Sequence, residues 1–418
     1  MGRWTTRRLR RVLARSAAAV VAAQCVTIGA LIVADARRKQ TRPQGVPARA
    51  HPGPVLVGAS EVQLYTNGEA LYHAMIEAIQ GAHERILFET YIWKDDMWGA
   101  RFKEELEQAA ARGVAVYITI DGFANLVVPR RFKRFAPAPA LHVLEYPLLP
   151  WPWQPLYPRS YARDHRKILV VDGQTAFAGG YNIGALYAAE WRDTHLRVTG
   201  PQAWEIENVF IDFWNMYRGA RLGRTLPELP NRHTRSWDPR IAVHRNSPPL
   251  LMYPIRATYL EAIDRAQRHI YLTHAYFIPD RVILRGLLAA AARGVDVRVL
   301  LPHTSNHVVA DWLARGYYDA CLAGGVRLLR YNAMVHAKTA TADGEWSTIG
   351  TANMDRLSMV GNFEVNVEVY DRGLARQMEE VFEADAASAD ELTLEEWRRR
   401  PPWAKVAELI LWPLRPLL

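Results

Sequence analysis

Two stretches of the chain pass in the same order from an apolar run to a helical pattern and back to an apolar run. In the first, the run 86–93 is followed by a helical stretch that ends in Ala-Ala-Arg-Gly-Val at 110–114, and then by the β-branched run 114–120. In the second, the run 270–277 is followed by a helical stretch that ends in the same five letters at 291–295, and then by the run 295–301. Each series predicts a strand, a helix and a strand, which together form a βαβ unit. We therefore expect two sheets that contain parallel pairs and are covered by helices.

An uncharged stretch near the N-terminus, residues 16–34, has the length of a membrane-spanning helix. Its 19 residues would extend over roughly 28 Å as a helix, close to the thickness of the hydrocarbon core. Basic residues flank it on both sides, with a slight excess on the N-terminal side, so its orientation is weakly determined. A cleaved signal peptide is the alternative, since Ala34-Asp35-Ala36 resembles a cleavage site, although signal peptides usually have shorter apolar regions. We expect a single N-terminal anchor in the cell membrane.

Composition and charge narrow the class of protein. Half of the residues are hydrophobic and 23% are charged, which excludes a disordered chain. The two cysteines, Cys25 and Cys321, exclude a disulfide scaffold and a zinc cluster built on thiolates. Residues 1–50 carry 11 of the 52 Lys and Arg residues and one acid, so this arm has a formal charge of +10. The rest of the chain carries 41 basic and 42 acidic side chains, which argues against a nucleic-acid-binding body.

These signals divide the chain into five parts. We expect a basic arm and membrane anchor at 1–39, a Pro- and Gly-rich linker at 40–54, a first lobe at 55–230, a second lobe at 231–385, and a C-terminal amphipathic, interfacial segment at 386–418. The aromatic and Pro-rich segment 146–158, which includes Tyr146, Trp151, Trp153 and Tyr157, also suits a membrane interface. A loop packed over the core and a docked terminal helix are the alternatives for these two segments.

The candidate chemistry lies in a motif that occurs once in each half. The pattern His-x-Lys-x4-Asp comprises His165, Lys167 and Asp172 in the first half and His336, Lys338 and Asp343 in the second. Two chance matches are expected on the order of 10⁻⁴ times in a chain of this composition. In a strand, residues two apart face the same side, so each His and Lys would project into one site. One imidazole can act as a nucleophile and the other as acid and base, while the lysines stabilise charge on a phosphoryl group, without a metal.

These motifs resemble those of the phospholipase D superfamily, the HKD phosphodiesterases, and the resemblance covers nearly all of residues 55–385. Gly-x-x-Asn follows each motif, at 179–182 and 350–353, with Thr351 where Ser is common. The resemblance implies that Asn182 and Asn353 bind the substrate phosphate. It also implies that Asp193 and Glu364, each 28 residues after a motif histidine, orient the catalytic histidines. By resemblance, Asp172 and Asp343 are more structural than chemical.

The implied fold is α/β: two pseudo-symmetric α-β-α sandwich lobes with the active site between them, plus an N-terminal transmembrane helix. Within the superfamily, residues 91–96, 191–195, 276–280 and 353–356 are most similar to bacterial cardiolipin synthases. The resemblance implies transfer of a phosphatidyl group between two phosphatidylglycerols, with His165 as nucleophile and His336 as acid and base, although the near symmetry of the two halves leaves open which histidine is the nucleophile. Cardiolipin and glycerol would be the products of this phosphatidyltransferase.

Three alternatives stay open from the sequence: a phospholipase D that hydrolyses phospholipids to phosphatidic acid, an HKD nuclease, and a non-catalytic membrane scaffold. We expect phospholipid substrates and the membrane as partners, no nucleic acid, no cofactor and no metal. Both half-sites lie in one chain, so catalysis needs no dimer, and the oligomeric state is open.

Overall fold

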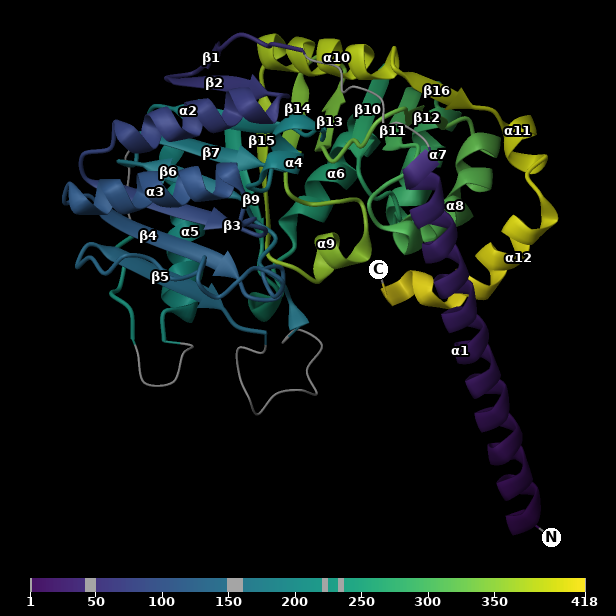
Figure 1. The fold of residues 1–418 in the computed structure, drawn as a ribbon. Coiled ribbons are helices and arrows are strands. Elements are labelled where there is room, and N and C mark those ends of the chain that lie inside the picture. Colours follow the sequence, from purple (N-terminus) through teal and green to yellow (C-terminus); the bar gives the residue numbers. More distant parts are fainter. Residues whose placement is uncertain (1, 42–49, 149–160, 220–224, 232–236, 418) are drawn as a thin grey trace.

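The computed structural model describes residues 2–41, 50–148, 161–219, 225–231 and 237–417. Two α/β lobes lie side by side, and the long N-terminal helix α1 (Gly2–Thr41) extends away from them (Figure 1). The predicted two-lobe α/β fold is therefore confirmed.

The first lobe is built on a sheet with the strand order β1-β2-β8-β7-β6-β3-β4-β5. Its strands are β1 (Val55–Val57), β2 (Ser60–Tyr65), β3 (Arg85–Thr90), β4 (Ala115–Asp121), β5 (Leu141–Tyr146), β6 (Ile168–Val171), β7 (Thr175–Gly179) and β8 (His195–Thr199). The β3–β4 and β4–β5 pairs are parallel, and the others are antiparallel. The helices of this lobe are α2 (Gly68–Gln80), α3 (Met97–Ala111), α4 (Ala185–Ala189) and α5 (Ala203–Tyr217).

Alternation along β3 places this sheet between two layers of helices. Ile86 and Phe88 belong to the buried cluster that contains α2 and α3, whereas Leu87 belongs to the cluster that contains α5. A strand buried on both faces has a nearly continuous apolar sequence, which is why the run that begins at residue 86 is apolar throughout.

The second lobe repeats this plan in the order β16-β12-β11-β10-β13-β14-β15-β9. Its strands are β9 (Ile241–Asn246), β10 (His269–His274), β11 (Asp296–Pro302), β12 (Arg327–Tyr331), β13 (Lys338–Ala342), β14 (Trp346–Gly350), β15 (Glu364–Tyr370) and β16 (Ala389–Leu392). The parallel pairs are β10–β11 and β11–β12. The helical elements are η2 (Pro248–Leu250), α6 (Pro254–Arg265), α7 (Arg281–Ala292), α8 (Val308–Ala323), α9 (Arg356–Val360) and α10 (Arg372–Ala386).

The two sheets correspond strand for strand, apart from an extra edge strand in each, β1 and β16. One buried apolar cluster is shared by the lobes, since it joins Phe210 and Trp214 of α5 to Val365 and Val367 of β15. Burial of apolar side chains from both lobes in one cluster holds the lobes together. The second sheet also extends past the expected boundary at residue 385, because β16 pairs with β12.

The first strand predicted in each half, β3 and β10 respectively, ends earlier than its apolar run. β3 ends at Thr90 and β10 at His274, three residues before the ends expected at 93 and 277. The residues that follow form single bridges instead: Trp93 with Ile183, and Phe277 with Met354. These residues are apolar because they remain buried, although they have left the sheet.

The C-terminal segment continues into α11 (Leu394–Arg398), α12 (Pro402–Leu411) and η3 (Trp412–Leu417). α12 packs against α1 and α8. Within α1, residues Ala14–Arg37 are long and apolar enough to cross a membrane, with a mean hydropathy of 2.2.

The expected membrane role of Tyr146 is wrong. Its side chain is buried at the end of β5 and contacts the rings of Phe213, Tyr217 and Phe363. Trp151, Trp153 and Tyr157 lie outside the described residues.

Candidate active site

One backbone hydrogen bond joins the two lobes at the start of each motif. The amide of His165 donates to the carbonyl of Phe363 at 3.0 Å, and the amide of His336 donates to the carbonyl of Arg192 at 2.6 Å. Each contact is part of a parallel bridge, Asp164 with Phe363 and Arg192 with Val335. Each motif histidine is thus placed beside a segment of the opposite lobe.

The same pairing brings each imidazole to a carboxylate from the other lobe. The Nδ1 atom of His165 lies 3.0 and 3.1 Å from the two carboxylate oxygens of Glu364. The Nδ1 atom of His336 lies 2.6 Å from Oδ2 of Asp193. Equal spacing along the chain groups Asp193 with His165 and Glu364 with His336, but spacing alone does not indicate which imidazole ring each acid contacts. A carboxylate at Nδ1 favours the tautomer with a free Nε2, which is the form that a nucleophile requires.

Both imidazoles line one cavity of about 380 Å³ between the lobes. Asn182 and Asn353, predicted to bind phosphate, line the same cavity. The side chain of His165 is 13% exposed and that of His336 is 7% exposed. The structure therefore brings together the two histidines and the two asparagines that the sequence singled out.

The two lysines are buried and contact the backbone of the motif histidines. The ammonium of Lys167 donates to the carbonyl of His165, and that of Lys338 donates to the carbonyl of His336. Burial lowers the pKa of Lys167 to about 8 and that of Lys338 to about 7, because a charged ammonium loses its hydration. The nearby carboxylates of Asp193 and Glu364 partly oppose this lowering of the pKa for both lysines. A phosphate anion in the cavity would favour the charged lysines further.

Burial disfavours the charged form of both imidazoles in the free enzyme. Burial lowers the pKa of His165, and the Glu364 carboxylate partly opposes the effect. Burial lowers the pKa of His336 well below its usual value, and the charges of Lys338 and Lys167 lower it further. A neutral imidazole is the nucleophilic form, and binding of an anionic phosphodiester raises the proton affinity of its partner.

Thr351 and Asn182 fix the surrounding polar groups. The Thr351 hydroxyl donates to Glu364 at 2.5 Å, so the departure from Ser preserves a hydroxyl that orients the carboxylate. Oδ1 of Asn182 accepts from the backbone amide of Ile92 at 3.2 Å, which directs the amide group of the side chain. Oδ1 of Asn353 is buried and accepts no hydrogen bond from the described residues.

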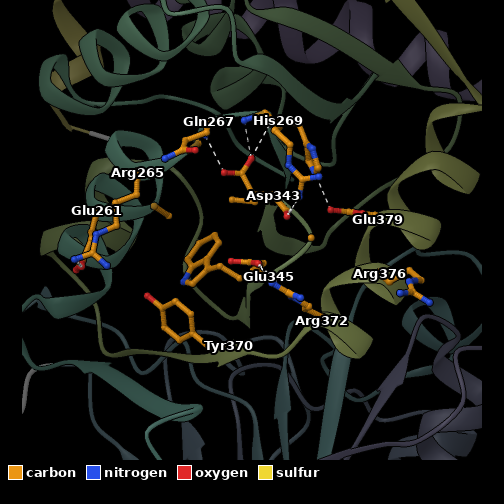
Figure 2. A pocket seen from close by; sticks show the side chains of 16 residues that line it. Glu261, Arg265, Gln267, His269, Asp343, Glu345, Tyr370, Arg372, Arg376 and Glu379 are labelled. Atoms are coloured by element: carbon orange, nitrogen blue, oxygen red, sulfur yellow. Dashed lines mark hydrogen bonds and ion pairs between the residues drawn. The ribbon is translucent and has the colours of Figure 1, made fainter.

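The two motif aspartates lie elsewhere. Asp172 accepts hydrogen bonds from the backbone amides of His83, Glu84 and Arg85 at 2.8–2.9 Å. Asp343 accepts in the same way from Gln267, Arg268 and His269, at the edge of a separate hollow of about 830 Å³ (Figure 2). Both aspartates have positive φ, 51° and 54°, so they form tight turns at the ends of β6 and β13. Neither lines the cavity that holds the histidines.

We expect Asp172→Asn to lower the free energy of unfolding by roughly 1–2 kcal/mol while kcat changes less than threefold. Burial raises the pKa of Asp172, but the three amide donors outweigh it and the net pKa is lowered. Its stabilising contribution is therefore present above the unfolded pKa and lost as pH falls through the lower, folded value. Denaturant unfolding at several pH values checks this, with Asp343→Asn as the matched variant. A hundredfold loss of kcat at unchanged stability would instead show that Asp172 takes part in catalysis.

Several cavity residues carry no role in the sequence interpretation: Tyr91, Trp191, Tyr276, Asn306, His307 and Asp355. Four of them lie in the stretches 91–96, 191–195, 276–280 and 353–356, whose similarity to cardiolipin synthases was the available signal. Asn306 and His307 follow β11 in a loop, where no local pattern marks them. Asn306 accepts from the hydroxyl of Tyr276 at 2.7 Å. Burial raises the pKa of Asp355 to about 7.

Two pseudo-symmetric lobes that bring two His-x-Lys segments to one cavity define an enzyme of the phospholipase D type. Residues 75–214 and 259–386 match the family model described as cardiolipin synthase, PLD-like domain. The chain belongs to this family.

Named relatives support this family assignment, and a solved structure shares the fold. The chain is 30% identical over 370 residues to the major cardiolipin synthase ClsA of Bacillus subtilis (strain 168), covering 86% of this chain and 76% of the relative. It is 32% identical over 374 residues to a cardiolipin synthase of Listeria monocytogenes serotype 4a (strain HCC23), covering 88% and 77%. Phosphatidylserine synthase of Haemophilus influenzae Rd KW20 shares the fold, with a TM-score of 0.66 at 14% identity over 85% of this chain and 93% of that chain.

Proposed function

We propose that this chain is a phosphatidyltransferase that makes cardiolipin and glycerol from two molecules of phosphatidylglycerol. The observation that carries the proposal is the pair of imidazoles in one cavity, each contacted at Nδ1 by a carboxylate from the opposite lobe. Such a pair can divide the work of a double displacement between a nucleophile and an acid and base. The names of the similar cardiolipin synthases support phosphatidylglycerol as the substrate.

In the first step, Nε2 of His165 attacks the phosphorus of one phosphatidylglycerol. The phosphorus–nitrogen bond forms while the bond to the glycerol headgroup breaks. His336 enters this step as an imidazolium, stabilised by Asp193 and the bound phosphodiester, and donates its Nε2 proton to the leaving oxygen. Lys167, Lys338, Asn182 and Asn353 stabilise the negative charge on the non-bridging oxygens. Both imidazoles line the cavity, and the side chain of His165 is the more solvent-exposed of the two, which supports its role as nucleophile.

In the second step, His336 accepts the proton from the primary hydroxyl of a second phosphatidylglycerol. Its oxygen attacks the phosphatidyl-histidine, the phosphorus–nitrogen bond breaks, and His165 is regenerated. Two displacements give retention of configuration at phosphorus. Proton transfer balances over the cycle because His336 gives and takes one proton.

Transfer requires that the acceptor lipid outcompete water in the cavity. Apolar and aromatic side chains supply much of the lining: Tyr91, Ile92, Trp191, Ile278 and Val309. Such a lining favours a lipid acceptor over bulk water. It supports transferase activity over the hydrolytic alternative.

We expect labelled phosphatidylglycerol in vesicles to yield cardiolipin and free glycerol in equal amounts. Product separation by chromatography and mass spectrometry measures both. Phosphatidic acid as the main product would assign the chain to hydrolysis. Cleavage of DNA without lipid turnover would assign it to the nucleases.

We expect kcat/KM to fall as pH rises from about 7 to above 8, because Lys338 and Lys167 then lose the charge that attracts the anionic phosphodiester. The falling limb of kcat should lie at higher pH, since bound phosphate stabilises both ammonium groups. Initial rates across pH at several bulk and surface concentrations of lipid measure the two profiles. Coincident limbs would exclude the lysines as the titrating groups.

Anchoring and domain organisation belong to the same proposal. Residues 1–39 would hold the enzyme in the cell membrane through α1, with 40–54 as the linker to the first lobe at 55–230 and to a second lobe that begins at 231 and extends past 385 to include β16. The length and hydropathy of α1 support a membrane-spanning helix. Mass spectrometry of the mature N-terminus distinguishes an uncleaved anchor from a cleaved signal peptide.

A further inference from the structure

The loop after β4 exposes apolar side chains at the end of the first lobe that holds the active site. β4 ends at Asp121, whose Oδ2 accepts from the amide of Asp164, the residue before His165. Leu126 and Val127 follow in the loop and are 58% and 82% exposed. Large apolar side chains at such exposure, beside a substrate cavity, are unfavourable in water and favour an apolar contact.

Basic residues continue this loop. Arg130 and Arg131 are exposed and follow Val127 within four positions. Arginines next to an exposed apolar tip suit a surface that is apolar in its interior and anionic at its boundary.

The second lobe has a matching apolar projection at the same end. Asn246, the last residue of β9, lies opposite Glu364, which contacts His165. The chain then continues into η2, and Leu250 and Leu251 are both more than half exposed. Apolar side chains from both lobes thus lie at the active-site end.

α12 adds a third apolar surface, in contact with the membrane helix. Its inner face, Ala404, Ala407 and Leu411, belongs to the buried cluster that contains Leu31 of α1. Its outer face exposes Val406 and Leu409. Gln24 of α1 donates to the carbonyl of Ile410 at 3.2 Å, so the two helices are joined directly. The N-terminal part of α1 projects past α12, away from the lobes (Figure 1).

The active-site cavity is continuous with this cluster. Ile278, Val309 and Ala310 line the cavity and also belong to, or pack against, the cluster that contains Leu31. An apolar wall therefore leads from the histidines toward α1. The opposite end of the sheets offers Leu56 in β1 and Tyr370 in β15, which lie far along their strands from the site.

We propose that the active-site end of both lobes, together with α12, is a docking surface for an anionic lipid bilayer. This docking surface comprises the loop 123–131, residues 250–252 and the outer face of α12. It presents the cavity mouth to the bilayer, so that both lipids reach the histidines with their acyl chains still in an apolar environment. The inference rests on the proposed function for its substrate, but the surface itself is tested without turnover.

Site-specific labelling of the full-length chain in phosphatidylglycerol-containing vesicles tests the docking surface. In a Cys25→Ser background, where Cys321 is buried, single cysteines at Val127, Leu251 and Leu409 carry an environment-sensitive NBD dye. We expect blue-shifted emission that is quenched by lipids with doxyl groups in their acyl chains. Matched labels at Leu56 and Tyr370 should stay aqueous. Aqueous emission at Val127 and Leu251 would overturn the proposal even if Leu409 is buried, and quenching at both ends would do the same.

Charge substitutions separate docking from catalysis. We expect Val127→Asp with Leu251→Asp to lose at least tenfold of the activity on vesicles and to keep it within twofold on a short-chain phosphatidylglycerol below its critical micelle concentration. Leu56→Asp with Tyr370→Asp is the matched control and should keep both activities. Equal losses on the two substrates would overturn the docking role. Failure of the proposed function would instead show as no cardiolipin from either substrate with the unmodified chain, whatever the labels report.

Discussion

Replacement of His165 by Asn is expected to lower turnover at least about 10⁴-fold, because no other group in the proposed mechanism can form the bond to phosphorus. His336→Asn should also lower turnover of phosphatidylglycerol strongly, since the glycerol oxygen leaves poorly without a proton. The two variants differ in what they accumulate. With a phosphatidyl-p-nitrophenol substrate, whose leaving group needs no proton, His336→Asn should still form the phosphatidyl-enzyme and then stall.

The phosphorus–nitrogen bond of a phosphohistidine hydrolyses in acid. Trapping is therefore best followed by intact-protein mass spectrometry at neutral or alkaline pH. We expect the added phosphatidyl mass with His336→Asn and none with His165→Asn. His73→Asn, at an exposed position on α2, is the matched control and should retain turnover within twofold. The opposite trapping pattern would exchange the roles of the two histidines. Absence of adduct in every variant, at inverted configuration, would remove the covalent step.

Much of the fold follows from local sequence. The apolar runs that begin at 86 and 270 predict strands because both faces of each central strand are buried. The repeated Ala-Ala-Arg-Gly-Val marks the same helix end twice, with Gly113 and Gly294 at positive φ. These patterns act over neighbouring residues, so a single sequence contains them.

Other features depend on how the lobes meet. Glu364 reaches His165 because residues 362–364 pair with 163–165 across the lobes, a contact 199 residues apart in the chain. Tyr146 has the composition of an interfacial residue, yet the same meeting of the lobes buries it against Phe363. His307 lies in the cavity only because α8 begins beside the second motif. No local pattern carries this information, since tertiary packing decides it.

The crossed pairing makes a distinct prediction for the two acids. Asp193→Asn should lower turnover by roughly 10²–10⁴-fold through His336, since the imidazolium loses its carboxylate partner. Glu364→Gln should act through His165 by a similar amount. In the proposed mechanism, the first substitution impairs protonation of the leaving group and the second impairs the attack on phosphorus.

A leaving group that needs no proton separates these effects. With phosphatidyl-p-nitrophenol, the burst of p-nitrophenol should recover most of its rate in Asp193→Asn but not in Glu364→Gln. Combining Asp193→Asn with His336→Asn should cost little more than His336→Asn alone, because the acid acts only through that ring. If each acid instead served the histidine of its own lobe, the burst would recover in Glu364→Gln. The two pairings predict recovery of the burst in different variants. This one substrate therefore decides whether each acid acts on the histidine of the opposite lobe or on that of its own lobe.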